Sequence, residues 1–241
     1  MEKSEFIAAL DRDSAAFVDA CEVAGLSTVV PSCPGWTVAD LLWHLAEVHY
    51  FWGSIVADRA TDPNGYSEPL RPHDEGLAAF YRNSRAELLT TLRPADPSMP
   101  VWTWSDDNTA GFVIRRMAHE TAVHLWDATD AAGLVNPLEP MLASDGIDEF
   151  LTHFLGDVLN GAAAVDGSVH IHCGDVAGEW TIREGDDDFL ITREHSKADC
   201  AIRGAASDIL LTLWRRVPLS TGDLVGDAEV AARFVAHTNL N

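Results

Sequence analysis

The chain has 241 residues, 47% of them hydrophobic, which is enough for one large globular domain or two modest ones with separate cores. Its 38 acidic against 16 basic residues give a formal net charge of −22, and such a surface repels a phosphate backbone, so we expect no nucleic-acid partner. No apolar run is long enough to span a bilayer, so we expect no membrane partner. The N-terminus is charged, unlike a secretory signal, and the four cysteines form no C-x-x-C pair. We therefore expect a cytoplasmic protein with reduced thiols.

The N-terminal part of the chain shows apolar residues at helical spacing in four segments, separated by loops rich in Pro, Gly and Ser. Thr37 with Asp40 three residues later resembles a capping box at the start of the second segment. Gly133 follows the fourth segment as a helix-terminating residue. Long helices joined by such loops predict an antiparallel bundle. The expected helices are residues 4–23, 37–58, 74–92 and 109–132.

The C-terminal part begins with a fifth expected helix, residues 140–159, and then changes to short alternating segments divided by Gly and Asp turns. These segments predict an antiparallel sheet with strands at residues 168–173, 179–183, 189–193 and 199–203. Two helices, at residues 206–215 and 228–236, close the chain. The sequence therefore predicts the α+β class, with a helical bundle over residues 1–140 and a smaller α+β domain over residues 141–241.

Three dispersed side chains, His44, Glu120 and His124, form a candidate metal site. Glu120 and His124 lie four residues apart, which places them on one face of a helix. Two imidazoles and one carboxylate suit zinc or a similar divalent ion, and three protein ligands leave a coordination position open. His49 and His119 point about 140° away from the candidate ligand on their own helices, so we expect neither to bind the ion. From the spacing alone, two interior histidines and a solvated glutamate are the more common arrangement.

Two aspartates near these residues have two readings each. Asp40 precedes His44 by four residues and Asp127 follows His124 by three, so each could accept a hydrogen bond from the other ring nitrogen of its histidine. Asp40 also fits an ordinary role near the start of its helix. The sequence leaves both readings open.

Two segments, residues 33–45 and 119–127, resemble the signatures of mycothiol-dependent maleylpyruvate isomerase-like proteins. That family belongs to the DinB-like metal-binding four-helix superfamily and carries a C-terminal α+β domain related to sterol carrier proteins, whose ending resembles residues 226–234 of this chain. The resemblance implies a DinB-like bundle with His44, Glu120 and His124 as the metal ligands. The motifs are specific for fold and metal, and much less so for substrate.

The resemblance also implies a function. A divalent metal, expected to be Zn²⁺, would convert mycothiol to its thiolate, which then adds to an electrophilic small molecule such as a dicarboxylate. If the thiol adds and then leaves, the reaction is a cis–trans isomerisation. If the thiol stays attached, the reaction is an S-transfer. The metal ligands are the same for both, so they do not distinguish the two reactions. The alternatives are a hydrolase with a metal-activated water and a non-catalytic protein that binds metal or a small ligand. We expect a monomer or a weak homodimer.

A carboxylate-bearing substrate needs a positive partner, and the candidate catalytic residues for this role are Arg215 and Arg216. Both close the helix expected at residues 206–215 and could reach over a cleft between the domains. The competing reading is two basic residues at a helix C-terminus, where the helix dipole favours them.

Overall fold

The computed structural model describes residues 1–134, 136–155, 164–185 and 188–238. It divides into two compact units, Met1–Asn136 and Pro137–Asn241, the first helical and the second mixed, which together give the expected α+β class. Within the described ranges, no helix combines the length and the apolar character that crossing a bilayer requires.

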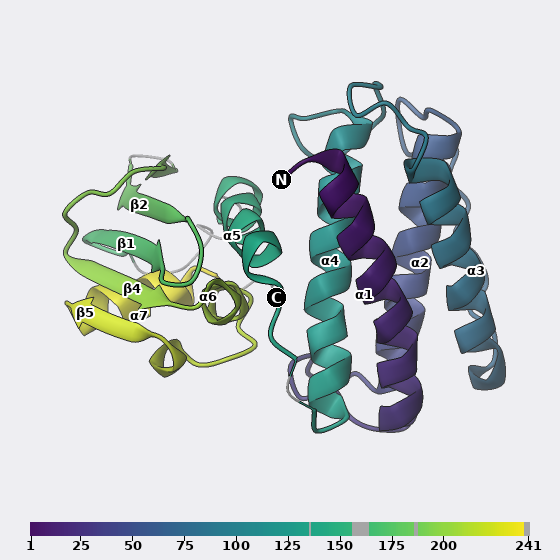
Figure 1. The fold of residues 1–241 in the computed structure, drawn as a ribbon, viewed down its shortest axis with the longest axis horizontal. Coiled ribbons are helices and arrows are strands. Elements are labelled where there is room, and N and C mark those ends of the chain that lie inside the picture. The colour runs from purple at the N-terminus through teal and green to yellow at the C-terminus, as the bar shows by residue number, and fades with distance from the viewer. Residues whose placement is uncertain (135, 156–163, 186–187, 239–241) are drawn as a thin grey trace. The chain divides into compact units, whose positions relative to one another are not determined.

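The first unit is a bundle of four helices (Figure 1). They are α1 (Lys3–Ala24), α2 (Val38–Ala57), α3 (Asp74–Leu92) and α4 (Ala110–Ala131). Helix α1 packs mainly against α4, and α2 packs mainly against α3. Each helix begins and ends within two residues of its expected bounds, because the caps are local: Thr37 accepts from the backbone N–H of Asp40, and Asp40 accepts from the backbone N–H of Thr37 (3.0 Å).

The core of the bundle is formed by the apolar faces of the four helices. Phe17 of α1, Leu41 and Leu45 of α2, Tyr81 of α3 and Leu125 of α4 are buried in one cluster. Tyr81 satisfies its hydroxyl by donating to the backbone carbonyl of Ser14 (3.0 Å), so this large ring is buried at no loss of hydrogen bonding. The packed core fixes the rotation of α2 and α4 about their axes, and with it the direction of His44 and His124.

In the residues that the structure describes, the second unit contains a five-stranded sheet and three α-helices (Figure 1). Helix α5 (Pro140–His153) is followed by β1 (Ser168–Cys173), β2 (Glu179–Glu184), β3 (Phe189–Thr192), β4 (Cys200–Gly204), α6 (Ala206–Leu213), the 3₁₀ turn η2 (Leu219–Thr221), β5 (Asp223–Gly226) and α7 (Ala228–Ala236). The helix expected to reach Leu159 ends at His153, and residues 156–159 lie outside the described ranges. The sequence pattern does not predict strand β5, because its four residues follow a turn that contains Pro218 and Gly222 and show no clear alternation.

The strand order is β3-β2-β1-β4-β5, and three of the four neighbouring pairs are antiparallel, as expected. The pair β1–β4 is parallel, a detail that alternation alone does not predict. Since β3 therefore runs in the same direction as β4, residues 193–199 must return along the sheet before β4 begins. We call residues 193–199 the return segment.

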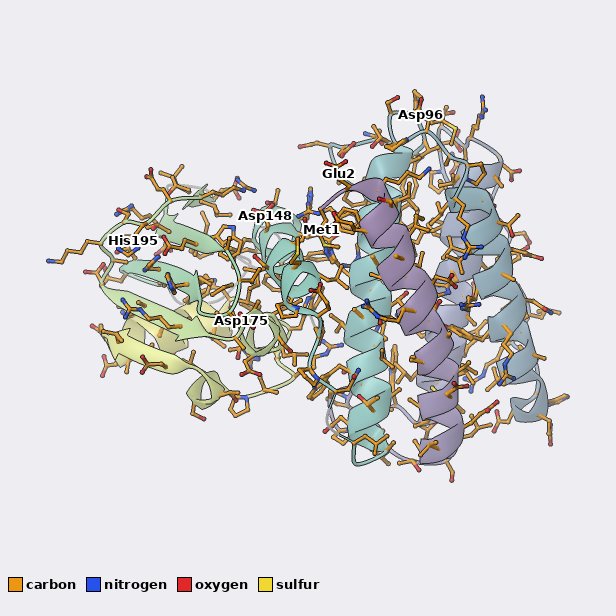
Figure 2. All side chains as sticks on the ribbon, in the orientation of Figure 1. Met1, Glu2, Asp96, Asp148, Asp175 and His195 are labelled. Carbon is orange, nitrogen blue, oxygen red and sulfur yellow. The ribbon has the colours of Figure 1, made fainter. Side chains whose placement is uncertain are left out.

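The two faces of the sheet differ in character. Val169, Ile171, Trp180 and Ile182 are buried on one face, and the alternate residues of β1 and β2 point to the other. On the buried side, Asp148 of α5 accepts a hydrogen bond from Trp180 Nε1 (3.0 Å). Asp175, in the loop after β1, accepts one from the first backbone N–H of α6 (2.9 Å; Figure 2). The core of this unit thus lies between the sheet and its helices.

Candidate metal centre in the helical bundle

The bundle brings His44, Glu120 and His124 together. Glu120 Oε1 lies 3.3 Å from His44 Nε2 and 3.1 Å from His124 Nε2, and the centroids of the two imidazole rings are 5.0 Å apart. All three ligand atoms lie within 4.8 Å of one another. The four-residue spacing on α4 supplies two of them and the packing of α2 supplies the third, so one carboxylate oxygen faces two imidazole nitrogens.

Asp127 holds the opposite side of the His124 ring. Its Oδ2 lies 2.8 Å from His124 Nδ1, and its Oδ1 accepts a hydrogen bond from Ser32 (2.6 Å). Asp127 is fully buried, so its charge depends on these donors. With Nδ1 donating to Asp127, it is the Nε2 side of His124 that faces Glu120, and an ion bound there would take the place of the Nε2 proton. Of the two readings of Asp127, the geometry favours the hydrogen-bond acceptor.

Arg116, one helical turn before Glu120, forms a close ion pair with Glu120 Oε2. Burial alone would raise the pKa of Glu120, but the Arg116 guanidinium and His124 hold it well below its usual range. Burial would likewise lower the pKa of His124, but the Glu120 and Asp127 carboxylates raise it to about 9. Sequence reasoning missed Arg116, although its four-residue spacing from Glu120 was a usable signal.

The neighbouring histidines point elsewhere. His49 Nε2 is 2.9 Å from the Thr121 hydroxyl, and burial lowers the pKa of His49 to about 3, so its ring is neutral. The His119 ring packs edge-on against Phe6, with centroids 5.8 Å apart. Neither histidine belongs to the group of ligand atoms around Glu120.

Asp40 acts at the start of α2. Its Oδ2 accepts from Thr37, and its Oδ1 forms an ion pair with Arg71 (2.8 Å). Of the two readings of Asp40, these contacts support the helix-capping one. The His44 ring contacts Trp36 instead, with ring centroids 5.0 Å apart. Trp36 therefore limits the rotation of His44, a role that the sequence did not indicate.

A second grouping shares one of these ligands. Cys33, Asp127 and His124 also place ligand atoms close together, with Cys33 Sγ 3.7 Å from Asp127 Oδ2. This grouping would use the Nδ1 side of His124, where Asp127 already accepts from the ring and from Ser32. The grouping around Glu120 places the Nε2 atoms of both histidines beside one carboxylate oxygen, and we take it as the better candidate.

Arg215 and Arg216 lie in the second unit, directly after α6. Arg215 has a left-handed backbone (φ 63°) and donates to the carbonyl of Val235 (2.9 Å). Arg216 donates to the carbonyl of Trp214 (2.9 Å), and its guanidinium carbon lies 5.8 Å from the centroid of the Trp214 ring. These contacts fit the reading as basic residues at a helix end, and a role in carboxylate recognition stays a prediction.

The donor set in the bundle fits a divalent ion. Two imidazole Nε2 atoms and one carboxylate Oε1 converge, while the second oxygen of Glu120 is held by Arg116 and the second nitrogen of His124 by Asp127. Each ligand is thus oriented by a further contact, as in metal sites generally. The His44 side chain is 33% exposed, so the group is accessible from solvent.

Comparisons with known proteins give the family and the fold of the chain. Residues 7–129 match the profile of the mycothiol maleylpyruvate isomerase N-terminal domain, and residues 141–233 match that of the MDMPI C-terminal domain. Solved structures of the mycothiol-dependent maleylpyruvate isomerase and of a histidine-to-alanine variant have the same fold. Their TM-scores are 0.60 and 0.61, at 12% and 11% identity, and each alignment covers 88% of both chains. No curated protein matches the chain. Since the two domain profiles cover most of its length, the chain belongs to the mycothiol maleylpyruvate isomerase family.

Proposed function

We propose that this chain is a mycothiol-dependent enzyme of the isomerase type, with a divalent metal, expected to be zinc, held by His44, Glu120 and His124. The observation that carries the proposal is the convergence of two imidazole nitrogens on one carboxylate oxygen in the bundle. Three protein ligands leave room for an exogenous ligand. An ion held there would supply the Lewis acidity that lowers the pKa of a thiol and raises the fraction of thiolate, the nucleophilic form.

The protein's own residues prepare the ligands. Asp127 keeps the Nδ1 hydrogen of His124 and so presents Nε2. Arg116 keeps Glu120 ionised and holds one of its oxygens, which leaves the other for the ion. Trp36 packs against His44 and shields that side of the ring from water. A thiol that enters from the exposed side of His44 would therefore meet ligands that are already oriented.

The substrate is proposed as a small electrophile, and a carboxylate-bearing cis-alkene is the first candidate. The two solved relatives are named for action on maleylpyruvate. Addition of a thiol to such a double bond leaves a single bond that rotates, and elimination of the same thiol returns the trans isomer. Retention of the thiol would instead make the chain an S-transferase.

The test is a thiol-dependence assay on the full-length, zinc-loaded chain. Maleylpyruvate is supplied with and without mycothiol, and both the trans product and any mycothiol conjugate are followed by mass spectrometry. We expect turnover only with mycothiol, and its loss in His44→Gln. Thiol-independent cleavage of maleylpyruvate by water, seen in the same mass spectra as hydrolysis products in place of the trans isomer, would support the hydrolase alternative. Thiol binding without turnover of either kind would support the binding-protein alternative.

The proposed role of Arg215 and Arg216 is tested in the same assay. If they bind a substrate carboxylate, Arg215→Ala and Arg216→Ala should each raise KM by about tenfold, the effect of one lost charged contact. Mycothiol binding to the zinc-loaded chain should be unchanged. Arg203→Ala, on β4 of the same unit, is the control. Equal KM values for all four proteins would remove these arginines from the site.

A further inference from the structure

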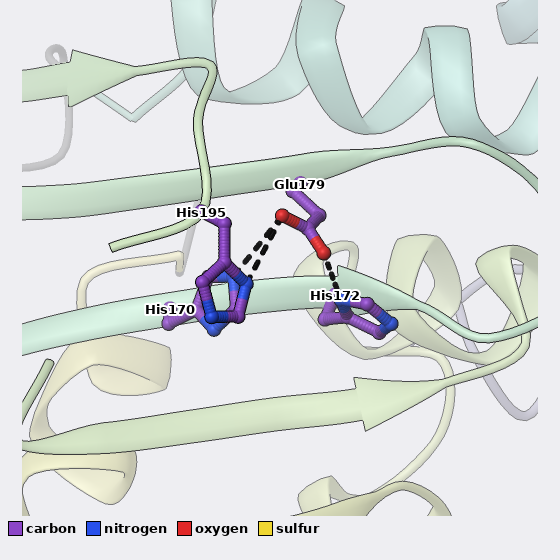
Figure 3. Close-up of side chains that lie close together, drawn as sticks. All are labelled: His170, His172, Glu179 and His195. Carbon is purple, nitrogen blue, oxygen red and sulfur yellow. Dashed lines mark ion pairs between the residues drawn. The ribbon is translucent and has the colours of Figure 1, made fainter. Parts of the chain in front are cut away.

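The second unit contains another cluster of metal-ligating side chains, formed by His170, His172, Glu179 and His195 (Figure 3). It lies on the face of the sheet opposite the buried apolar residues. The bundle site uses none of these residues, so the cluster is independent of the proposed function.

Strand geometry places three of the four side chains. His170 and His172 are two residues apart on β1, so both point to the same face of the sheet. Glu179 of β2 is the direct cross-strand partner of His172, and partners in an antiparallel pair share a face. Glu179 Oε1 forms a close ion pair with His172 Nδ1.

The return segment, residues 193–199, supplies the fourth side chain. The Thr181 hydroxyl donates to the carbonyl of Glu194 (3.2 Å), and Arg183 donates to the carbonyl of Lys197 (3.3 Å). Thr181 and Arg183 point to the same face as Glu179, so these bonds hold the segment across that face. As a result His195 Nδ1 lies 3.2 Å from Glu179 Oε2.

The ligand atoms of the four residues all lie within 4.8 Å of one another. The His170 and His195 rings meet nearly at right angles, with centroids 4.8 Å apart. His170 Nε2 is 4.0 Å from Glu179 Oε2, too far for a hydrogen bond. The side chains range from 4% exposed at His170 to 69% at His195, so the cluster opens to solvent on one side.

His170 is the member that most needs a ligand. Its residue is 3% exposed, and its Nε2 has no hydrogen-bond partner among the residues that the structure describes. A buried polar atom without a partner costs free energy, and a bound ion is one of the standard ways to satisfy it. The nitrogen is directed at the centre of the cluster, where the other three ligand atoms converge.

We propose that His170, His172, Glu179 and His195 bind a divalent transition metal of the zinc type. Three imidazoles and one carboxylate select such an ion over Mg²⁺ or Ca²⁺, which prefer oxygen ligands. Four protein ligands complete a tetrahedral shell, so the site is structural. The ion would join β1, β2 and the return segment. Arg203 of β4 is the cross-strand partner of His172, and its positive charge would repel a cation bound at the cluster. Its side chain is exposed, so water screens this repulsion.

The test is a zinc count on the full-length chain without an affinity tag. Metal-free protein is loaded with zinc, passed through gel filtration and analysed by mass spectrometry. We expect two zinc ions per wild-type chain and one in His172→Gln and in His195→Gln, both of which change exposed or half-exposed side chains. Glu194→Gln, an exposed carboxylate beside His195, is the matched control and should keep both ions.

A second measurement locates the ion. Zinc should slow amide hydrogen exchange in residues 193–199 of the wild-type chain and leave it unchanged in His172→Gln. The zinc count also distinguishes failure of the bundle proposal from failure of this one. If the bundle binds no zinc, the wild-type chain carries one ion and His172→Gln carries none. If the sheet binds no zinc, both proteins carry one. The inference is overturned if the wild-type chain keeps no zinc that depends on His172 or His195, or if zinc leaves exchange in residues 193–199 unchanged.

Discussion

The bundle and the sheet each gather histidines around one glutamate, but they do so by different geometry and to different effect. In the bundle, Glu120 and His124 are one helical turn apart and His44 comes from a second helix. In the sheet, His170 and His172 are two residues apart on one strand and share a face, and Glu179 lies beside them on the next strand. The bundle supplies three candidate ligands and the sheet four. An ion with three protein ligands has a position for a substrate thiol, whereas an ion with four is a structural link.

The two clusters also differ in how the carboxylate is balanced. Glu120 is paired with Arg116, which is almost fully buried, so its charge is compensated by a permanent cation. Glu179 is balanced by His172 and His195, whose charge depends on protonation. The bundle site is therefore fixed by the fold, while the sheet site depends more on what it binds. The following variants test this difference.

The largest effect is expected from His124→Ala. Removal of one of three ligands should empty the bundle site. We expect mycothiol-dependent turnover to fall by more than about 100-fold, because loss of a residue that only orients a ligand already lowers activity by about 10–100-fold. The ion of the sheet site should stay, so the zinc count falls by one. His119→Gln, on the same helix, should keep both ions because its ring packs against Phe6. Full zinc content in His124→Ala would refute the ligand assignment.

Arg116→Gln should separate charge compensation from metal binding. Without the guanidinium, the buried Glu120 carboxylate of the metal-free chain loses its permanent cation and keeps only His124 as a positive partner, so we expect a loss of about 3 kcal/mol in the free energy of unfolding. Zinc replaces the missing positive charge and should restore most of that loss. Denaturant unfolding of both forms measures the difference, with Arg115→Gln as the neighbouring control. An equal loss with and without zinc would mean that Arg116 acts only through packing.

Asp127→Asn should show that the bundle site depends on a hydrogen-bond acceptor behind its ligand. An amide in place of the carboxylate weakens the bond to His124 Nδ1, and such changes typically lower metal affinity or activity by about 10–100-fold. Isothermal titration with zinc measures the affinity. Asp130→Asn, three residues further along α4, is the control. Unchanged affinity in Asp127→Asn would mean that α4 alone orients His124.

The sequence predicted the bundle well because its signals are local. Helix periodicity and the cap at Thr37 set the bounds of α2, and a four-residue spacing placed Glu120 beside His124. The approach of α2 to α4 depends on tertiary packing, and only the family resemblance predicts it. Arg116 escaped notice because an Arg–Glu pair four apart is usually an ordinary pair on a helix surface, whereas here it is buried.

The sheet cluster was harder to predict. The alternation around His170 and His172 correctly predicts a strand, and a strand alone puts both rings on one face. What the sequence does not contain is the register that sets Glu179 opposite His172 and the parallel β1–β4 pair that sends His195 back across the sheet. Register and crossover depend on contacts between distant residues, so local patterns leave them open.

The smallest effect is expected from Asp40→Asn, which distinguishes an aspartate that caps a helix from one that orients a ligand. The backbone N–H of Thr37, the Arg71 guanidinium and the Thr37 hydroxyl lower the pKa of Asp40 from 3.8 to about 2. A lowered pKa means that the ionised carboxylate stabilises the folded chain above pH 3.8, and that this contribution is lost as the pH falls towards 2. Because Asp40 is more than a third exposed, screening keeps the loss at neutral pH below about 1 kcal/mol. Thermal unfolding should therefore show a small deficit for Asp40→Asn at neutral pH that shrinks as the pH falls from 3.8 to 2, with an unchanged zinc count. A lower zinc affinity of the bundle site in Asp40→Asn, like that expected for Asp127→Asn, would contradict this assignment. It would mean that Asp40 orients His44 in the same way that Asp127 orients His124.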